Sequence, residues 1–400
     1  MMSDFKNGGA FARRDVLRFG IGAVSTLPLM NMSLSALASE GGYTGLKDII
    51  LINNLGGISN PNLRMLPSDK KANPVAGSKA LSLDPRALED ALASGTTAVN
   101  QTLGYVAGPE DPFEYTVGEI ARWNRIINHH SDKLLKVWTA ADIERAKREG
   151  KIGIIMGFQN GAMMGENAER VDMFAGLGVK IIQLTYNGRN QLGDGSMEAE
   201  NRGLTEFGRE VVARLNATNI AVDLSHSGEQ TCLDAIQASE RPICISHTGC
   251  RALANLPRNK TDEELRLMAD KGGVAGIYFM PFLKEDSFPT AEDVVLHIEH
   301  AIKVCGEDHV GIGTDGGTTA IDDMAGYHKI IDDEISRRQK AGISAKGEKK
   351  GVVPFIPDIQ GPGQFQQLAD MMAARGHSST RIEKVLGANF LRYYRDIWGA

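Results

Sequence analysis

The sequence predicts an α/β protein, a (β/α)8 barrel, from three observations. Eight short apolar runs, many rich in β-branched residues, alternate with segments of helical periodicity. Several runs are almost continuously hydrophobic, as expected for parallel strands covered on both faces. The chain has 400 residues, which is enough for one such barrel with insertions.

The predicted strands lie at residues 48–52, 97–100, 152–157, 179–185, 220–225, 242–247, 274–279 and 310–315. The predicted helices lie at 117–127, 140–148, 206–216, 229–239, 263–271 and 291–304, and two closing helices follow at 363–374 and 379–394. Candidate N-caps precede four of them, at Thr139, Thr205, Thr261 and Thr290. Residues 341–353, which are rich in Lys and Gly, are expected to form an exposed loop.

The alternative fold is an open, doubly wound sheet. That fold usually carries a Gly-rich phosphate loop after its first strand. Here Gly56 and Gly57 follow the first predicted strand, but no G-x-G-x-x-G motif does. The barrel is therefore favoured, and a dinucleotide site is not expected.

Composition and charge exclude several function classes. The formal net charge is −6, aromatic residues make up 6% of the chain, and no basic block occurs. Such a chain is a poor candidate for binding nucleic acid. The four cysteines, Cys232, Cys244, Cys250 and Cys305, form no C-x-x-C pair, so we expect buried free thiols instead of a zinc ribbon or a redox motif.

The N-terminal segment, residues 1–38, has the pattern of an export signal. Arg13 and Arg14 precede an uncharged stretch that ends in the small-residue pattern Ala36-Leu37-Ala38. The arginine pair resembles a twin-arginine signal. We therefore expect recognition by the twin-arginine export machinery, cleavage, and a periplasmic or secreted protein with a single domain at residues 39–400.

The alternative for this segment is an uncleaved N-terminal membrane anchor. Residues 19–38 are nearly long enough to span a bilayer, but their Ser, Asn, Gly and Pro content makes them weakly hydrophobic. The twin-arginine route exports proteins that are already folded, often with an inserted cofactor. Export of this kind would favour a metal or redox protein without proving one.

Candidate catalytic residues follow three of the predicted strands. In barrel enzymes the working residues lie at the carboxyl ends of the strands. His226 follows the fifth predicted strand, His247 ends the sixth, and Asp315 ends the eighth. Two neutral imidazoles and one carboxylate suit zinc, so this constellation predicts a metal site.

Five stretches of the chain resemble a known family. They read LTYNGRNQLGDG, GLTEFGREVVARLNATNIAVDLSHSG, PICISHTGCRALANLPRNKTDEELRLM, HVGIGTDGG and RIEKVLGANFLRYYRDIW. They resemble the membrane dipeptidase (renal dipeptidase-like) family, peptidase family M19, over residues 152–398. The resemblance implies a TIM barrel of the metallo-dependent hydrolase type with two bridged zinc ions that cleaves dipeptides, some with D-residues. A homodimer would suit the family, and the oligomeric state stays open.

Four positions match the family's functional residues. His226 and His247 match the two histidines that hold the second zinc ion, and Asp315 matches the aspartate associated with the first zinc ion and the nucleophilic water. Arg258 matches the arginine that binds the substrate carboxylate. The resemblance implies these roles here.

Four other positions depart from the family pattern. The H-x-D motif after the first strand falls at Asn54 and Gly56, and neither residue can replace its counterpart. The bridging glutamate falls at Gln159, which lacks the charge that holds two cations together. The histidine after the fourth strand becomes Tyr186, which can still donate a hydrogen bond to an oxyanion.

These departures limit the expected metal content. Catalytic zinc normally has three protein ligands and a water. The resemblance therefore implies at most one zinc ion, held by His226 and His247 with Asp315 or Gln159 as a third ligand, or no metal at all. Glu166 is a further candidate ligand.

A polar loop follows the fourth predicted strand. Its residues Asn187, Arg189 and Asn190 either face the substrate or form a hydrogen-bonded turn. We assign Asn187 and Asn190, together with Tyr186 and Arg258, as candidate substrate-binding residues.

Three functions remain open from the sequence. The first is an exported dipeptidase-like hydrolase with at most one metal ion, in which Asp315 acts as base and Tyr186 assists the intermediate. The second is a metal-poor family member that tailors another periplasmic peptide-like substrate by acid–base chemistry. The third is a non-catalytic binding protein, and fold analogy alone cannot choose among them.

Overall fold

The computed structural model describes residues 42–65, 83–340, 342 and 344–399. The chain divides into one unit at Met1–Ser39 and a second at Glu40–Ala400. The predicted export signal at residues 1–38 lies outside the described residues. In the described part of the chain, no helix combines the length and the apolar character that crossing a membrane requires.

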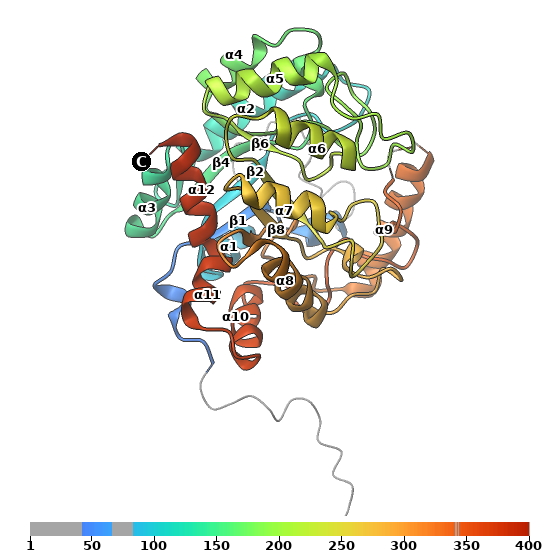
Figure 1. Cartoon of the computed structure of the whole chain (residues 1–400). Coiled ribbons are helices and arrows are strands. Elements are labelled where there is room, and N and C mark those ends of the chain that lie inside the picture. Colours follow the sequence, from blue (N-terminus) through green and yellow to red (C-terminus); the bar gives the residue numbers. More distant parts are fainter. Residues whose placement is uncertain (1–41, 66–82, 341, 343, 400) are drawn as a thin grey trace, which may run out of the picture. The chain divides into compact units, whose positions relative to one another are not determined.

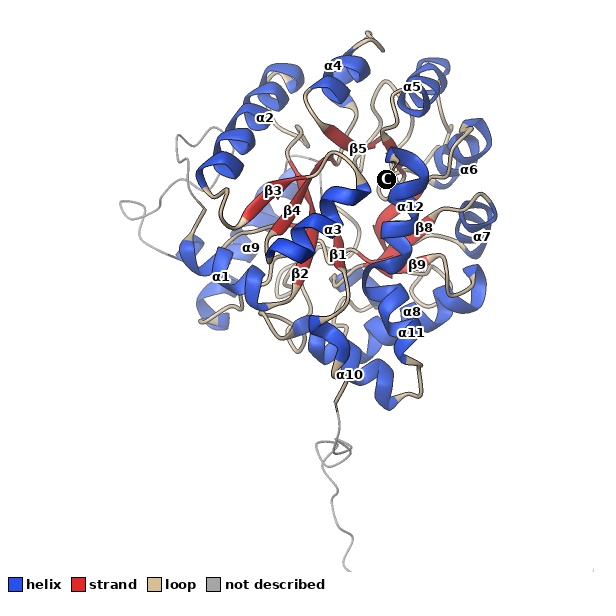
Figure 2. Cartoon of the chain, turned by 90° about the vertical axis from the view of Figure 1, so that its left-hand side faces the viewer, coloured by secondary structure: helices blue, strands red, loops and turns tan. Residues whose placement is uncertain are grey.

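Eight parallel strands form the barrel, as the sequence predicts (Figures 1 and 2). In spatial order they are β1 (Leu51–Gly56), β2 (Thr96–Thr102), β4 (Ile152–Phe158), β5 (Val179–Gln183), β6 (Ala221–Asp223), β7 (Cys244–Thr248), β8 (Val274–Ile277) and β9 (Val310–Ile312). The barrel closes where the Asp315 amide donates to the Leu55 carbonyl at 2.9 Å. A ninth strand that the sequence analysis missed, β3 (Leu134–Lys136), pairs with β4.

Helices surround the strands (Figure 2). They are α1 (Pro85–Ala93), α2 (Pro112–His129), α3 (Ala140–Glu149), α4 (Arg170–Gly176), α5 (Glu206–Ala217), α6 (Glu229–Ala238), α7 (Asp262–Asp270), α8 (Ala291–Cys305), α9 (Met324–Lys340), α10 (Gln364–Ala374), α11 (Ser379–Glu383) and α12 (Asn389–Trp398). Short 3-10 turns lie at Gly45–Lys47, Pro61–Met65, Ala162–Met164 and Pro281–Leu283. The four predicted threonine N-caps are confirmed.

Two details of the predicted helices are wrong. The last predicted helix, at 379–394, is interrupted by a π-turn at Lys384–Ala388. A Cβ atom at Gly387 would lie 2.0 Å from the Ile50 carbonyl oxygen, so the glycine permits this close approach to the chain before β1. The sequence analysis also missed α1, α4 and α9.

The first layer inside the barrel is apolar. It consists of side chains near the starts of the strands, namely Ile52, Ala98, Ile155, Ile181, Ala221, Cys244 and Val274. The aromatic face of α12 packs against this layer with Phe390, Tyr393, Tyr394 and Trp398. The C-terminal helix therefore covers the amino end of the barrel, and the opposite end remains for chemistry.

The next layer inside the barrel is polar. Side chains alternate along each strand, so the positions two residues further on also face inward. They are occupied by buried Asn54, Asn100, Gln183, Asp223 and Ser246. Burying polar groups is costly unless they are hydrogen-bonded, and this layer supports the site above it.

The expected exposed loop at 341–353 is only partly exposed. Residues 341 and 343 lie outside the described residues. Ala345, Val352 and Val353 are buried, and Val353 packs in a small cluster with residues of α9. These apolar side chains correct the expectation, because they anchor the loop. Cys232, Cys244 and Cys250 are buried free thiols as predicted, and Cys305 is a half-buried one.

Candidate active site

Two histidines and one aspartate meet at the carboxyl end of the barrel. His226 follows β6, His247 lies in β7, and Asp315 follows β9. The two Nε2 atoms are 3.0 Å apart, and His247 Nε2 is 3.9 Å from Asp315 Oδ2. The structure therefore brings together three residues that are distant in the sequence.

The outer nitrogen of each imidazole has a hydrogen-bond partner. His226 Nδ1 lies 2.7 Å from Asn187 Oδ1, and His247 Nδ1 lies 2.8 Å from Ser246 Oγ. Burial lowers the pKa of both histidines, and the positive charge of Arg258 lowers it further. Both imidazoles are therefore neutral near pH 7, which is the form that binds metal.

Asp315 occupies an unusual backbone conformation. Its φ angle is 57°, in the left-handed region that aspartate tolerates better than most residues. Burial raises the pKa of its carboxyl group to about 6, while Arg258 and Arg338 act in the opposite direction. A carboxyl group that titrates near neutral pH suits proton transfer.

Arg258 lies in the segment between β7 and α7, and its side chain is almost fully buried. Its Nη1 donates to the Ser225 carbonyl oxygen, and its guanidinium lies 5.9 Å from the centre of the Tyr278 ring. Its charge acts on both histidines and on Asp315. The structure therefore places the predicted carboxylate-binding cation within electrostatic reach of the site.

Tyr186 and Asn187 both contact His226. The Tyr186 ring stacks on the imidazole, with centroids 4.3 Å apart and planes inclined by 25°. Arg338 of α9 hydrogen-bonds to Tyr186 and forms an ion pair with Glu348 through two contacts of 2.9 Å. Sequence analysis missed Arg338, because only the tertiary structure brings α9 to this end of the barrel.

Asn190 is engaged in the loop that follows β5. Its Nδ2 donates to Asn160 Oδ1 at 2.9 Å and to the Leu184 carbonyl at 2.8 Å. Its Oδ1 accepts from the Leu192 amide at 2.8 Å. These contacts match the hydrogen-bonded turn that the sequence left open, and the substrate-binding role of Asn190 stays a prediction.

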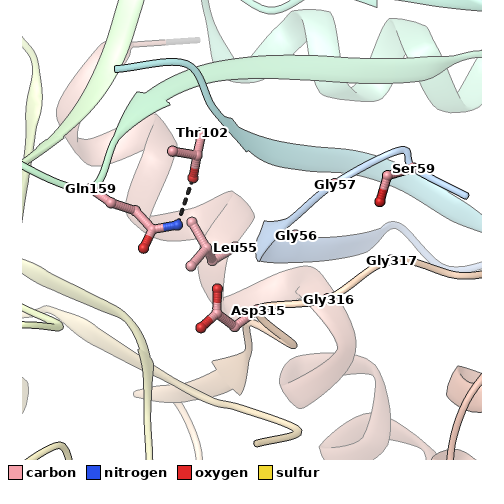
Figure 3. A pocket seen from close by; sticks show the side chains of 9 residues that line it. All are labelled: Leu55, Gly56, Gly57, Ser59, Thr102, Gln159, Asp315, Gly316 and Gly317. Atoms are coloured by element: carbon pink, nitrogen blue, oxygen red, sulfur yellow. Dashed lines mark hydrogen bonds between the residues drawn. The ribbon is translucent and has the colours of Figure 1, made fainter. Parts of the chain in front are cut away.

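A cavity of about 210 Å³ lies beside Asp315. Its lining consists of Leu55, Gly56, Gly57, Ser59, Thr102, Gln159, Asp315, Gly316 and Gly317 (Figure 3). Gln159 Nε2 donates to Thr102 Oγ1 at 2.7 Å, and its amide and the Asp315 carboxylate are directed into the same space. The cavity is thus polar on one side and formed by glycine backbone on the other.

The side chain of Asn54 is not arranged to bind a metal ion. Its Oδ1 accepts a hydrogen bond from the Tyr394 hydroxyl, and its buried Nδ2 has no partner within the described structure. An amide nitrogen does not ligate zinc, and Gly56 offers no side chain. The residues present therefore do not fit a binuclear centre.

The two histidines do fit a single metal ion. Two nitrogens bound to one zinc ion at ~2.0–2.1 Å lie roughly 3.3 Å apart in a tetrahedral site, close to the observed 3.0 Å. Among the residues that the structure describes, no three His, Cys, Asp or Glu side chains are close enough to hold a metal as they stand. Asp315, 3.9 Å from His247, would complete the set after a small approach.

The fold and this site define a (β/α)8 barrel of the metallo-dependent hydrolase type. The family model "Membrane dipeptidase (Peptidase family M19)" matches residues 89–345. The chain belongs to this family and is a hydrolase of the dipeptidase class.

Individual relatives agree with this assignment. A solved structure of an amidohydrolase from Pseudomonas aeruginosa is 33% identical, with a TM-score of 0.72, over 89% of this chain and 98% of its own. Dipeptidase tcpJ from Claviceps purpurea is 27% identical to this chain. The matched region covers 70% of this chain and 60% of that protein. A metallo peptidase from Rhodobacter sphaeroides, liganded with a phosphinate mimic of the dipeptide L-Ala-D-Ala, shares the fold at 20% identity, with a TM-score of 0.67 over 88% of this chain and 99% of its own.

Proposed function

We propose that the protein hydrolyses a dipeptide, or a small peptide-like amide, that carries a free carboxylate, and that it uses at most one zinc ion. One observation carries this proposal: His226 and His247 face each other with Nε2 atoms 3.0 Å apart, beside Asp315. The ligand of the R. sphaeroides structure, a mimic of a dipeptide, supports the substrate class.

His226, His247 and Asp315 would hold the ion, with Gln159 as the alternative third ligand. A zinc ion there would supply Lewis-acid activation of water and of the scissile carbonyl group. Asp315, with a carboxyl pKa of about 6, accepts the proton of the attacking water and returns it to the leaving amine.

Arg258 and Tyr186 act on the substrate in this proposal. Arg258 attracts the substrate carboxylate, as charge-assisted hydrogen bonds to guanidinium groups do. Tyr186 directs its hydroxyl hydrogen at the developing oxyanion. Arg338 hydrogen-bonds to Tyr186 and keeps the ring in place over His226.

The metal-poor alternative has one specific observation in its favour. No ready three-ligand group is present among the described side chains. In that case Asp315 and the histidines carry out acid–base chemistry on another periplasmic peptide-like substrate, or the site binds such a ligand without turnover. Loss of activity without any change in metal content on replacing His247 distinguishes this case.

We also propose export through the twin-arginine machinery, directed by Arg13 and Arg14 in residues 1–38, to the periplasm or the medium. The supporting observation is the sequence pattern of this segment. A membrane anchor is the alternative. Replacing both arginines by lysine should retain the protein in the cytoplasm, whereas unchanged export would contradict the proposal.

The test of the catalytic proposal is a dipeptide panel with L- and D-residues at the second position. His247→Ala should lower kcat/KM at least 100-fold, because it removes a ligand of the only proposed ion. His300→Ala is the matched control, since His300 pairs with Asp262 outside the site. Equal activity in His247→Ala and the wild type would contradict the proposal.

A further inference from the structure

Asp223 lies in the polar layer beneath the histidines and is 1% exposed. Its Oδ1 accepts hydrogen bonds from the Ser225 amide at 3.0 Å, the Ser225 hydroxyl at 2.6 Å and the Ser246 amide at 2.9 Å. Its Oδ2 accepts from the Ser246 hydroxyl at 2.5 Å. Burial raises the pKa of Asp223, and these four donors oppose that effect by stabilising the carboxylate.

The Ser246 hydroxyl has one hydrogen, and Asp223 accepts it. Ser246 Oγ can therefore only accept a hydrogen bond from His247 Nδ1, 2.8 Å away. This arrangement places the ring proton of neutral His247 on Nδ1. The lone pair of His247 Nε2 is then directed at His226.

His226 is held in the same way by Asn187. The Asn187 side-chain oxygen lies 2.7 Å from His226 Nδ1 and accepts the proton there. The two Nε2 lone pairs therefore face each other across 3.0 Å. Such an arrangement is unfavourable without a cation between them.

We propose that Asp223, acting through Ser246, is a positioning residue that fixes His247 as the Nδ1–H tautomer and presents its Nε2 lone pair to a metal ion. The proposal rests on the one-ion site described above and extends it to the buried polar layer of the barrel. Partners of this kind orient metal-bound histidines in general, and their loss costs ~10–100-fold in metal affinity.

Ser225 provides a matched control for Ser246. Both serines are buried and donate to the same carboxylate. Ser225 Oγ accepts from the His247 backbone amide at 3.0 Å and lies 2.9 Å from Ser246 Oγ, but it makes no hydrogen bond to either imidazole among those described. A merely structural role of Asp223 would make the two serines equivalent.

The first readout needs no metal. In chelator-treated protein with ¹⁵N-labelled histidine, long-range ¹H–¹⁵N spectra should show His247 as the Nδ1–H tautomer, assigned with His247→Ala. Ser246→Ala should shift it toward the Nε2–H form, and Ser225→Ala should not. An unchanged tautomer in Ser246→Ala would overturn the proposal.

The second readout is zinc affinity, measured by competition with a chromophoric chelator. Ser246→Ala should weaken binding at least 10-fold, Ser225→Ala should stay within about twofold, and Ser246→Thr should recover the affinity because it keeps the hydroxyl. Equal losses of zinc affinity in both alanine variants would overturn the proposed relay, the hydrogen-bond chain from Asp223 through Ser246 to His247. If Ser246→Ala does not fold, Asp223→Asn tests the same relay, and unchanged affinity there would also overturn it. If the wild type binds no zinc, the one-ion site fails, while the tautomer spectra still decide the relay.

Discussion

The Tyr394 hydroxyl, on the helix that covers the amino end of the barrel, donates a hydrogen bond to the side-chain oxygen of Asn54 in β1. The family pattern places a histidine ligand at this position. Here the only side-chain oxygen of Asn54 is directed at α12, so a ligand position has become part of the barrel core. The remaining metal chemistry therefore depends on His226, His247 and Asp315.

Tyr394→Phe should destabilise the fold without affecting catalysis. The substitution leaves the buried Asn54 oxygen without its donor, which costs ~1–3 kcal/mol. Urea unfolding measures the loss, and kcat/KM should stay within twofold. Tyr393→Phe is the control, because its hydroxyl contacts the Pro242 carbonyl at 3.3 Å and the Cys244 side chain, and neither contact involves Asn54. A larger loss in the control would contradict this account.

Gly56→Ala should strain the closure of the barrel. A Cβ atom there would lie 2.2 Å from Asn53 Nδ2 and 2.8 Å from the Gly316 carbonyl oxygen. Forcing an atom into such a contact costs ~1–3 kcal/mol. Gly118→Ala in α2 is the matched control, because a Cβ atom there meets no atom within 4 Å. This variant should be more stable by up to ~1 kcal/mol, because alanine favours the helix over glycine. An unchanged free energy of unfolding in Gly56→Ala would contradict this expectation, because it would show that the neighbouring atoms move aside at little cost.

The stability of the metal-free protein should depend on the ionisation of Asp315. Its carboxyl pKa rises from 3.8 to about 6 on folding, so the native state holds this proton more tightly than the unfolded chain. Protonation of Asp315 therefore contributes at most ~3 kcal/mol to the free energy of unfolding. This contribution is complete below about pH 4 and is lost as the pH rises through 6.

Asp315→Asn should abolish this contribution. Urea unfolding between pH 4 and 7, with chelator present, compares the two proteins. The difference in free energy of unfolding between variant and wild type should change across this range. Parallel curves would show that Asp315 does not titrate there.

Arg258→Lys should impair selection for a substrate carboxylate. Lysine keeps the charge but loses the planar fork of donors, and hydrogen bonds to charged groups are worth ~1.5–3 kcal/mol. We expect kcat/KM for free-carboxylate dipeptides to fall ~10–100-fold, by the same principle, and C-amidated analogues to change little. Equal losses on both substrates would instead indicate a structural role, in line with the contact to Ser225.

Much of the fold was predictable from the sequence, because most barrel strands contain a short apolar run. The predicted first strand, 48–52, was wrong in its bounds, because β1 (Leu51–Gly56) continues through the polar residues Asn53 and Asn54. β3 was missed because its apolar part is only Leu134 and Leu135, between Lys133 and Lys136. α9 was missed because it packs against few partners, with Tyr327, Ile331 and Ile335 as its buried residues, so its apolar stripe is weak.

The site was predictable where strand ends converge. His226, His247 and Asp315 could be grouped because each follows or ends a predicted strand. The contact between Arg338 and Tyr186 depends on how a long insertion folds, and no local pattern reports that. The relay from Asp223 to His247 depends on inward-facing serines, which look ordinary in a sequence. The signal in the sequence was Asp223 three residues before His226, but alternation along a strand can direct such a side chain elsewhere, which favoured a structural role.

Zinc content per chain tests the central claim most directly. Elemental mass spectrometry on protein purified without chelator or added metal should find about one zinc ion per chain, lost in His226→Ala but kept in His300→Ala. Two ions per chain would contradict the account, because Asn54, Gly56 and Gln159 leave no ligand set for a second ion. No zinc, with no uptake when zinc is added, would contradict the one-ion site and would favour metal-free chemistry on Asp315 and the two histidines.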